Sequence, residues 1–173
     1  MSLNSNTQAT LADFTSPGLI VSQLRGRDAA SVILELSEAL HSEGRVQELV
    51  TFYRAVMDRE SLASTEMETT TAFPHARLPG LKELSFAFGQ NADGIAWGVR
   101  GRVRFIFLIA VPESESEQYL LLISGLACLV SNGRYLEQLR GTQNARQILG
   151  TFQQVKLKTN SQPDSPKIFP TPI

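Results

Sequence analysis

Apolar positions in the first half of the chain recur at helical spacing. Between Asp28 and Gly44 they return every three or four residues, which predicts a helix with one buried face, capped by Asp28 and ended by Gly44. A second run of the same kind predicts a helix over residues 45–60. Ahead of both, residues 19–24 are rich in β-branched side chains and bounded by glycines, as is typical of a strand. The first half is therefore expected to hold a strand followed by two amphipathic helices.

The second half of the chain opens with strand patterns. Residues 84–89 alternate between apolar and other positions, and residues 94–101 have the glycine content of a loop or hairpin. Residues 103–111 predict a central strand covered on both faces, because their alternation gives way to a continuous apolar run. Helical patterns follow over residues 117–130, 135–140 and 144–155. The first of these helices is almost wholly apolar, so we expect it to be buried between other elements.

Alternation of strands and helices predicts an α/β fold: a single domain in which a small mixed β-sheet is flanked by helices on both faces. We expect a flexible leader over residues 1–10 and the folded domain over residues 11–155. Residues 156–173 contain four prolines and no hydrophobic periodicity, which predicts a disordered tail.

Composition excludes several classes of function. The 173 residues are 42% hydrophobic and 19% charged, with a net charge of −1, so no long-range attraction draws the chain to nucleic acid or to an anionic membrane. No segment reaches the roughly 18–20 apolar residues of a membrane span, and the polar N-terminus lacks a signal-peptide pattern. We expect a soluble cytoplasmic protein that neither binds nucleic acid nor inserts into membranes.

Cysteine and histidine are scarce. The single cysteine, Cys128, allows no intrachain disulfide, and its apolar surroundings (LLISGLACLV) predict a buried, inert thiol. One of the two histidines, His41, falls in the last turn of a predicted helix, where it complements the dipole. So few ligands predict no metal site. The common nucleotide, hydrolase and metalloprotease motifs do not occur, and no cofactor is expected.

The segment FPHARLPG, residues 73–80, holds the other histidine. Pro74 keeps Phe73 extended, so His75 follows a rigid bend just past a strand end. A neutral imidazole offers a nucleophilic nitrogen at neutral pH, and Arg77 could bind an anion such as phosphate. Motifs of this size are weakly specific. From these residues alone, His75 is either a turn histidine beside an exposed arginine or a functional group.

The neighbouring segments make the pattern more specific. Four blocks occur in order: RESLAST (residues 59–65), AFPHARLPGLKE (residues 72–83), NADGIAWG (residues 91–98) and VRFIFLIAVPE (residues 103–113). Together they resemble the enzyme IIA domain of the bacterial phosphotransferase system, in the fructose–mannitol branch that includes the nitrogen-regulatory proteins. The resemblance covers about residues 11–155.

That resemblance implies a phosphocarrier. In the family, the histidine of the P-H-A-R motif receives a phosphoryl group from the small carrier HPr and passes it to a IIB component. His75 would be the phosphoryl acceptor and Arg59 would bind the phosphoryl oxygens, with Thr65 and Arg77 as further phosphate-binding residues. Positioning and charge neutralisation are what phosphoryl transfer chiefly needs. The alternative for Arg59 is a helix-end residue beside Glu60.

Two departures from the family pattern support a second hypothesis. Many members have another histidine where this chain has Tyr119, which we expect either to orient the ring of His75 or to pack in the core. The loop before the histidine commonly contains glycine, whereas here it carries Glu66 and Glu68, whose carboxylates repel phosphate unless they point outward. The alternative is a regulatory interaction module, with phosphorylation as a signal or lost. The expected partners are an HPr-like carrier and either a IIB component or a regulated target protein.

Overall fold

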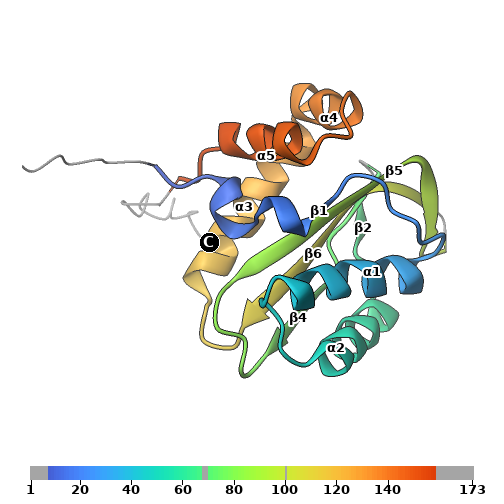
Figure 1. Cartoon of the computed structure of the whole chain (residues 1–173), viewed down its shortest axis with the longest axis vertical. Coiled ribbons are helices and arrows are strands. Elements are labelled where there is room, and N and C mark those ends of the chain that lie inside the picture. The colour runs from blue at the N-terminus through green and yellow to red at the C-terminus, as the bar shows by residue number, and fades with distance from the viewer. Residues whose placement is uncertain (1–7, 68–69, 100, 159–173) are drawn as a thin grey trace, which may run out of the picture.

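The computed structural model describes residues 8–67, 70–99 and 101–158. These residues form one mixed sheet of six strands between two helical layers (Figure 1). Helices α1 (Ala29–Ser42) and α2 (Leu49–Leu62) cover one face of the sheet. Helices α3 (Glu117–Ser131), α4 (Gly133–Arg140) and α5 (Ala145–Gln154) cover the other, together with the short 3-10 helix η1 (Leu11–Phe14). The predicted α/β fold with a small mixed sheet flanked on both faces is confirmed.

The sheet is built around two long central strands. The strands are β1 (Ile20–Val21), β2 (Glu66–Met67), β3 (Thr71–Ala72), β4 (His75–Leu78), β5 (Ser85–Trp97) and β6 (Gly101–Pro112), and a second 3-10 helix, η2 (Pro17–Leu19), leads into β1. Their order is β1-β5-β6-β3-β2, and β4 also pairs with β6. Strands β5 and β6 form an antiparallel hairpin, while β1 lies parallel to β5, and β3 and β4 lie parallel to β6.

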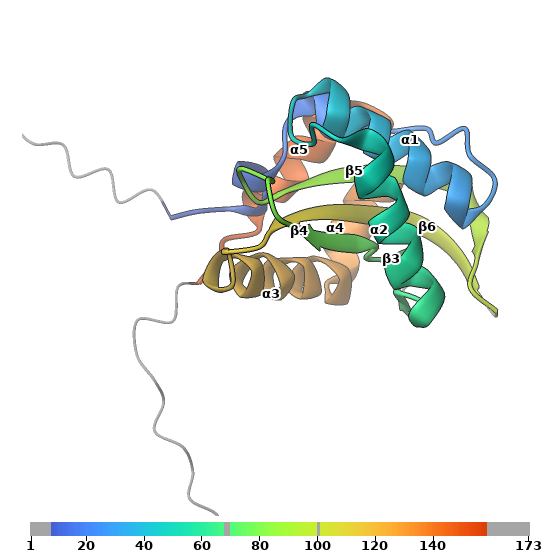
Figure 2. The same ribbon diagram turned by 90° about the horizontal axis from the view of Figure 1, so that it is seen from below.

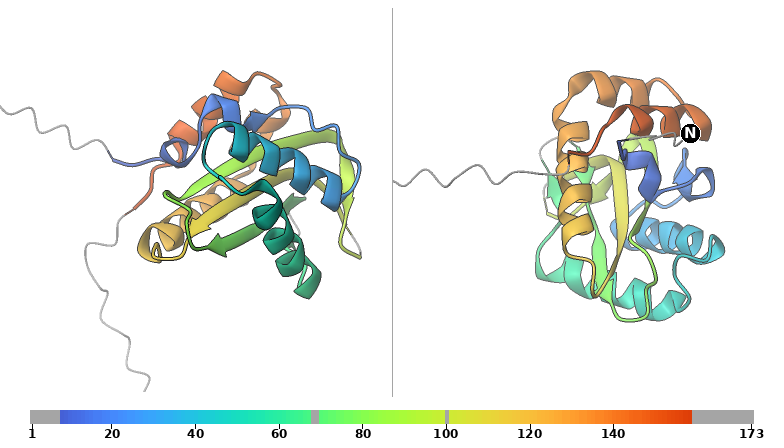
Figure 3. Two further views of the ribbon diagram at one scale, coloured as in Figure 1. Left: turned by 60° about the horizontal axis from the view of Figure 1, so that its bottom comes forward. Right: turned by 90° about the vertical axis from the view of Figure 1, so that its left-hand side faces the viewer.

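Strand β6 is the centre of both hydrophobic cores. Its side chains alternate, so that Phe107 and Ile109 pack under α3, α4 and α5, whereas Ile106 and Leu108 pack under α1 and α2. The edge-on view in the right panel of Figure 3 shows the sheet between its helical layers. The prediction of a central strand covered on both faces is confirmed.

Helix α1 begins where the sequence predicted. The carboxylate of Asp28 accepts a hydrogen bond from the backbone N–H of Ser31 (2.8 Å) and another from its hydroxyl (2.7 Å). The hydrogen bonds from the Ser31 side chain, and then from its backbone, lower the pKa of Asp28 below its ordinary value.

Helix α2 begins at Leu49, four residues later than predicted. The backbone N–H groups of Arg45 and Val46 donate to the Leu40 carbonyl and close the end of α1, so residues 45–48 connect the two helices. The side chain of Val46 is buried, which explains its place in the apolar pattern. His41 donates through Nδ1 to the Val46 carbonyl (2.8 Å), which gives this histidine a structural role at the helix end.

Strand β5 is longer than predicted. Of the loop or hairpin expected over residues 94–101, the structure shows a hairpin: β5 continues to Trp97, because Ile95 pairs with Val103 and both Ile95 and Trp97 are buried under α1 and α2. The turn between β5 and β6 is confined to the residues after Trp97, of which residue 100 lies outside the described chain.

Helix α3 is covered on one side only, and the prediction that it is buried between other elements is wrong. Leu122, Leu126 and Leu129 face the sheet and the neighbouring helices, whereas Leu120 is 68% exposed. Figure 2 shows α3 along the outside of the molecule. Cys128 lies on the outward side and is exposed, so its predicted burial is also wrong.

In the part of the chain that the structure describes, no single helix is both long and apolar enough to cross a membrane. Helices α3 and α4 meet this criterion only as a pair, by length and composition, and they are bent by 80° at the break between them.

The two ends of the described chain lie side by side. The backbone N–H of Leu157 donates to the Ala9 carbonyl (2.8 Å), Thr10 and Lys156 form an isolated antiparallel bridge, and Leu157 is 3% exposed. The predicted disordered tail therefore cannot begin at residue 156. Residues 1–7 of the predicted leader and residues 159–173 of the predicted tail lie outside the described residues.

Candidate functional site

His75 lies at the first position of a strand rather than in a turn. It opens β4, which runs parallel to β6 with His75 opposite Ile109, and the backbone N–H of Ile109 donates to the Pro74 carbonyl (2.9 Å). The expected rigid support is therefore present, but it is a sheet edge rather than a bend. Sequence patterning missed this strand because four residues between two prolines are too short to show a period.

The imidazole of His75 has a defined tautomer. Its Nδ1 lies 2.9 Å from the Phe73 carbonyl oxygen. A carbonyl oxygen only accepts hydrogen bonds, so Nδ1 carries the proton and donates it. In the neutral imidazole, the second nitrogen, Nε2, then carries the lone pair, which is the form required of a nucleophile.

His75 lines a pocket of about 320 Å³ together with Arg59, Arg77 and Tyr119. Arg59 comes from the last turn of α2, Arg77 from β4, and Tyr119 from the first turn of α3. Four of the five predicted site residues thus meet in one place. Besides His75, the described residues that line the pocket include two charged side chains, Arg59 and Arg77. Both are cationic, which favours an anionic ligand.

Arg59 is half-buried and partly tethered. One of its terminal nitrogens, Nη1, donates to the Ala63 carbonyl at 3.2 Å, just past the end of α2. A guanidinium carries five N–H donors in a fixed fork, so this single bond orients the group and leaves donors for a ligand.

Arg77 and Tyr119 form a unit beside His75. Arg77 donates through Nη1 to the carbonyls of Pro112 (3.3 Å) and Glu113 (3.2 Å). The central carbon of its guanidinium lies 5.3 Å from the centroid of the Tyr119 ring, within range of a cation–π interaction. The Tyr119 ring in turn lies 6.3 Å from the imidazole of His75, centroid to centroid, at an interplanar angle of 43°.

Thr65 does not line this pocket. Its hydroxyl and its backbone N–H both donate to the carboxylate of Glu60, at 2.7 and 2.8 Å. The same carboxylate accepts from the hydroxyl of Ser64 (3.3 Å) and from the indole N–H of Trp97 (2.8 Å). Glu60 therefore holds the segment after α2 against β5, next in sequence to Arg59. The sequence gave no sign of the pairing with Trp97, because the two residues are 37 positions apart.

Glu66 is directed towards the turn between β5 and β6. A Cβ atom at Gly101 would lie 2.5 Å from Oε2 of Glu66, and one at Gly98 would lie 3.0 Å from Oε1. Glycine at these two positions leaves room for the carboxylate, which does not line the His75 pocket. Glu68, the other acidic residue of this loop, lies outside the described residues.

Comparison with known families gives one match that spans most of the chain. The sequence model of the family described as "Phosphoenolpyruvate-dependent sugar phosphotransferase system, EIIA 2" matches residues 13–155.

Individual relatives are distant and differ in length. The fructose-specific EIIABC component of Bacillus subtilis is 25% identical over 76% of this chain, which spans 21% of that protein. The transcriptional regulator ManR of the same organism is 26% identical over 78% of this chain, which spans 20% of it. A nitrogen regulatory protein of Bradyrhizobium diazoefficiens is 24% identical over 80% of this chain and 91% of its own length.

Solved structures show the same fold. Nitrogen regulatory protein IIA-Ntr of Neisseria meningitidis superposes with a TM-score of 0.75 at 22% identity, over 82% of this chain and 98% of its own. Enzyme IIA-mannitol of Escherichia coli, solved in complex with phosphorylated enzyme IIB-mannitol, superposes with a TM-score of 0.68 at 20% identity, over 79% of this chain and 95% of its own.

Proposed function

Because this chain belongs to the EIIA 2 family of the phosphoenolpyruvate-dependent sugar phosphotransferase system, we propose that it is a phosphocarrier whose His75 accepts a phosphoryl group at Nε2. The observation that carries the proposal is the hydrogen bond from Nδ1 to the Phe73 carbonyl. It leaves Nε2 as the nucleophile of a side chain that lines a pocket with two arginines.

The transfer needs little from the protein beyond position and charge. Nε2 attacks the phosphorus of a phosphohistidine on an HPr-like donor, so that the donor's N–P bond breaks as the new bond to Nε2 forms. The positive charge that develops on the imidazole is stabilised by the bond from Nδ1–H to the Phe73 carbonyl. The guanidinium groups of Arg59 and Arg77 neutralise the phosphoryl oxygens.

The onward acceptor is a IIB component. A relative of the same fold has been solved with phosphorylated enzyme IIB-mannitol, which supports this class of partner for the present chain. The transfer from the HPr-like donor is reversible, because it exchanges one phosphohistidine for another of similar chemistry. Such a route implies a cytoplasmic protein.

Tyr119 favours a second function, a regulatory interaction module of the same fold. A phenol does not exchange protons at neutral pH as an imidazole does, so the chain lacks the second titratable ring of many relatives. Proteins named for regulation also stand among the relatives. In this alternative, phosphorylation of His75 is a signal read by a target protein, or it does not occur.

Labelling with phosphoenolpyruvate decides whether His75 is an acceptor. Incubation with enzyme I, HPr and labelled phosphoenolpyruvate is expected to give an acid-labile phosphoprotein, and His75→Ala to abolish the label. His41→Ala is the matched control, because it removes the other histidine and should leave labelling intact. A phosphorus NMR signal assigned to Nδ1-phosphohistidine, or a wild-type protein that stays unlabelled with its own donor, would contradict the proposal.

Arg59 is tested in the same assay. Removing a charged donor to the phosphoryl group typically costs about 1.5–3 kcal/mol, so Arg59→Gln is expected to slow labelling roughly 10- to 150-fold. Arg54→Gln changes an exposed arginine of the same helix outside the pocket and should have no effect. Equal labelling rates for both variants would show that Arg59 is a helix-end residue with no part in phosphate binding.

A further inference from the structure

The hairpin of β5 and β6 carries an irregularity far from His75. Gln90 pairs with Phe105 and the next aligned pair is Ile95 with Val103, so residues 91–94 of β5 stand opposite Arg104 alone. On the other side of β6, the backbone N–H groups of Arg104 and Phe105 both donate to the Thr70 carbonyl, at 2.8 and 3.2 Å. Such bulges redirect side chains and are enriched beside functional sites.

A pocket of about 300 Å³ opens at this bulge. It is lined by both Arg104 and Phe105, so the bulge brings two consecutive side chains of β6 to one cavity. The lining also includes Arg140 at the end of α4 and Gln143 before α5. Arg104 lies five residues before Ile109, the partner of His75, which is roughly 16 Å along an extended strand. This cavity is separate from the site of the proposed phosphoryl transfer.

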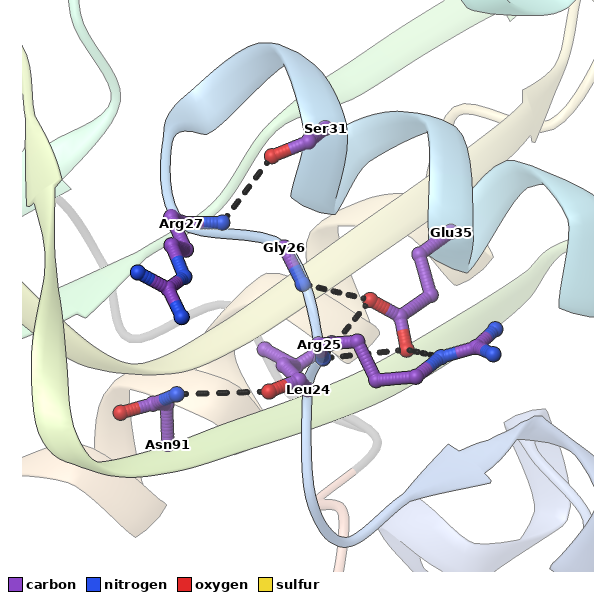
Figure 4. A network of polar contacts seen from close by, with 7 residues as sticks. All are labelled: Leu24, Arg25, Gly26, Arg27, Ser31, Glu35 and Asn91. Atoms are coloured by element: carbon purple, nitrogen blue, oxygen red, sulfur yellow. Dashed lines mark hydrogen bonds and ion pairs between the residues drawn. The ribbon is translucent and has the colours of Figure 1, made fainter.

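Ser22, Gln23 and Leu24 form one wall of the pocket, and a network of polar contacts holds Leu24 and the residues after it (Figure 4). Asn91 donates through Nδ2 to the Leu24 carbonyl (3.3 Å). The carboxylate of Glu35 accepts from the backbone N–H groups of Arg25 (3.0 Å) and Gly26 (3.1 Å). The chain at Leu24 and just after it is therefore held in place, which lowers the cost of ordering this wall when a ligand binds.

Gln90 supplies an unsatisfied acceptor. The residue is 7% exposed, and its Nε2 donates to the Thr142 carbonyl (2.7 Å). That bond fixes the amide orientation, because a carbonyl cannot donate. Its Oε1 is buried and has no hydrogen-bond partner among the described residues. Buried acceptors are rarely left unpaired, so Oε1 calls for a donor from outside the chain.

The charges around the pocket are of both signs. Arg104 makes no ion pair within the described chain, while Arg140 pairs with Glu137 (2.6 Å) and places its guanidinium carbon 5.8 Å from the centroid of Phe105. Asp93, also in the lining, is exposed and likewise makes no ion pair with a described residue. A ligand that pairs with all of these groups carries an anionic group for Arg104 and a cationic hydrogen-bond donor for Asp93 and Gln90.

We propose that this pocket binds a small zwitterion of the α-amino-acid type. Its carboxylate pairs with Arg104, and its ammonium donates to Oε1 of Gln90 and to the carboxylate of Asp93. Leu24 and Phe105 offer apolar surface to the side chain of the ligand. The site is additional to the proposed phosphocarrier function and does not depend on it.

Binding is tested with the twenty common L-amino acids, added singly at millimolar concentration to the ¹⁵N-labelled full chain. At least one is expected to bind saturably and to shift the side-chain amide signals of Gln90. Arg104→Met should weaken that binding about tenfold or more, since a charge-assisted pair is lost. Arg146→Met removes an exposed arginine outside the pocket and should change nothing. His75→Ala should also bind normally, which separates this site from the phosphoryl-transfer site.

Three results would overturn the proposal. The first is that none of the amino acids binds. The second is that acetate or inorganic phosphate binds as tightly as the best amino acid, which would remove the role of the ammonium. The third is unchanged affinity in both Arg104→Met and Gln90→Leu, with each variant shown by its NMR spectrum to be folded.

Discussion

The side chain of Tyr119 contacts two residues of the candidate site. The sequence led us to expect either a hydroxyl that orients the ring of His75 or a side chain packed in the core. In the structure the ring is half-buried and adjoins the imidazole of His75, and its face lies under the guanidinium of Arg77. The aromatic face of Tyr119 therefore helps to hold a cation beside the proposed phosphoryl acceptor, together with the carbonyls of Pro112 and Glu113.

This arrangement predicts different rates of phosphoryl transfer for three substitutions of Tyr119. Tyr119→Phe keeps the face under Arg77 and should be phosphorylated at the wild-type rate. Tyr119→Ala removes a cation–π contact of about 0.5–1 kcal/mol, which corresponds to a two- to fivefold slower transfer. Tyr119→His restores a titratable ring next to His75 and should speed transfer. Rapid-quench measurement of labelling from phospho-HPr checks all three, and a slow Tyr119→Phe would assign the effect to the hydroxyl instead.

Some residues of the candidate site could be predicted from sequence motifs, whereas the roles of others are visible only from their contacts in the folded chain. His75, Arg59 and Arg77 could be predicted because each belongs to a short segment that resembles a family motif. Glu60 could not, because its role depends on donors from two segments, and the second of these, at Trp97, meets Glu60 only in the folded chain. The hydroxyl of Thr65 was expected to serve a phosphate, but in the structure its proton is donated to Glu60.

Among the elements, α2, the segment after it and β5 are joined through one carboxylate. Glu60 on α2 accepts from Ser64 and Thr65 and from the indole of Trp97 on β5. Glu60→Gln replaces one acceptor oxygen by an NH₂ group, so at least one of these donors is left without a partner. We expect the free energy of unfolding to fall by about 1–3 kcal/mol, measured by urea denaturation.

Trp97 reports the same change directly. It is the only tryptophan of the chain and is 1% exposed, so its fluorescence should shift when the bond from its Nε1 to Glu60 is lost. Glu48→Gln, at an exposed position before α2, is the control and should alter neither stability nor emission. A Glu60→Gln protein with wild-type stability and emission would show that the carboxylate does not hold α2 to the sheet.

Long elements could be predicted from periodicity, and short ones could not. Helix α1 and strand β6 carry enough turns or alternations for their patterns to identify them. Strand β4 has four residues and β1 has two, and both exist because a long neighbour offers them hydrogen bonds. The outward side of α3 mixes polar residues with Leu120, Ala127 and Cys128, and all of these are exposed, so the largely apolar composition of the helix wrongly predicted burial.

At the scale of the whole molecule, the two candidate sites lie along a single strand. His75 pairs with Ile109 in the second half of β6, and the pocket beside Gln90 opens at Arg104 in its first half. Strand β6 is buried on both faces between these points, so the two sites share a rigid support. Their positions on one strand follow from topology and could not be read from the order of the motifs.

Closure of the domain depends on Leu157, which joins the two ends of the described chain. Its side chain packs against Gly125 of α3, in the space that a Cβ atom at position 125 would need. Its backbone N–H donates a hydrogen bond to the Ala9 carbonyl. Leu157→Ala opens a cavity among these segments and should lower the free energy of unfolding by about 2–5 kcal/mol. Of these segments, only α3 also contributes to the pocket of His75, through Tyr119 in its first turn, so the folded fraction should still be phosphorylated at the wild-type rate. Lys158→Ala, one residue further on and exposed, should leave stability unchanged, and equal stability of the two variants would place Leu157 outside the cooperative unit.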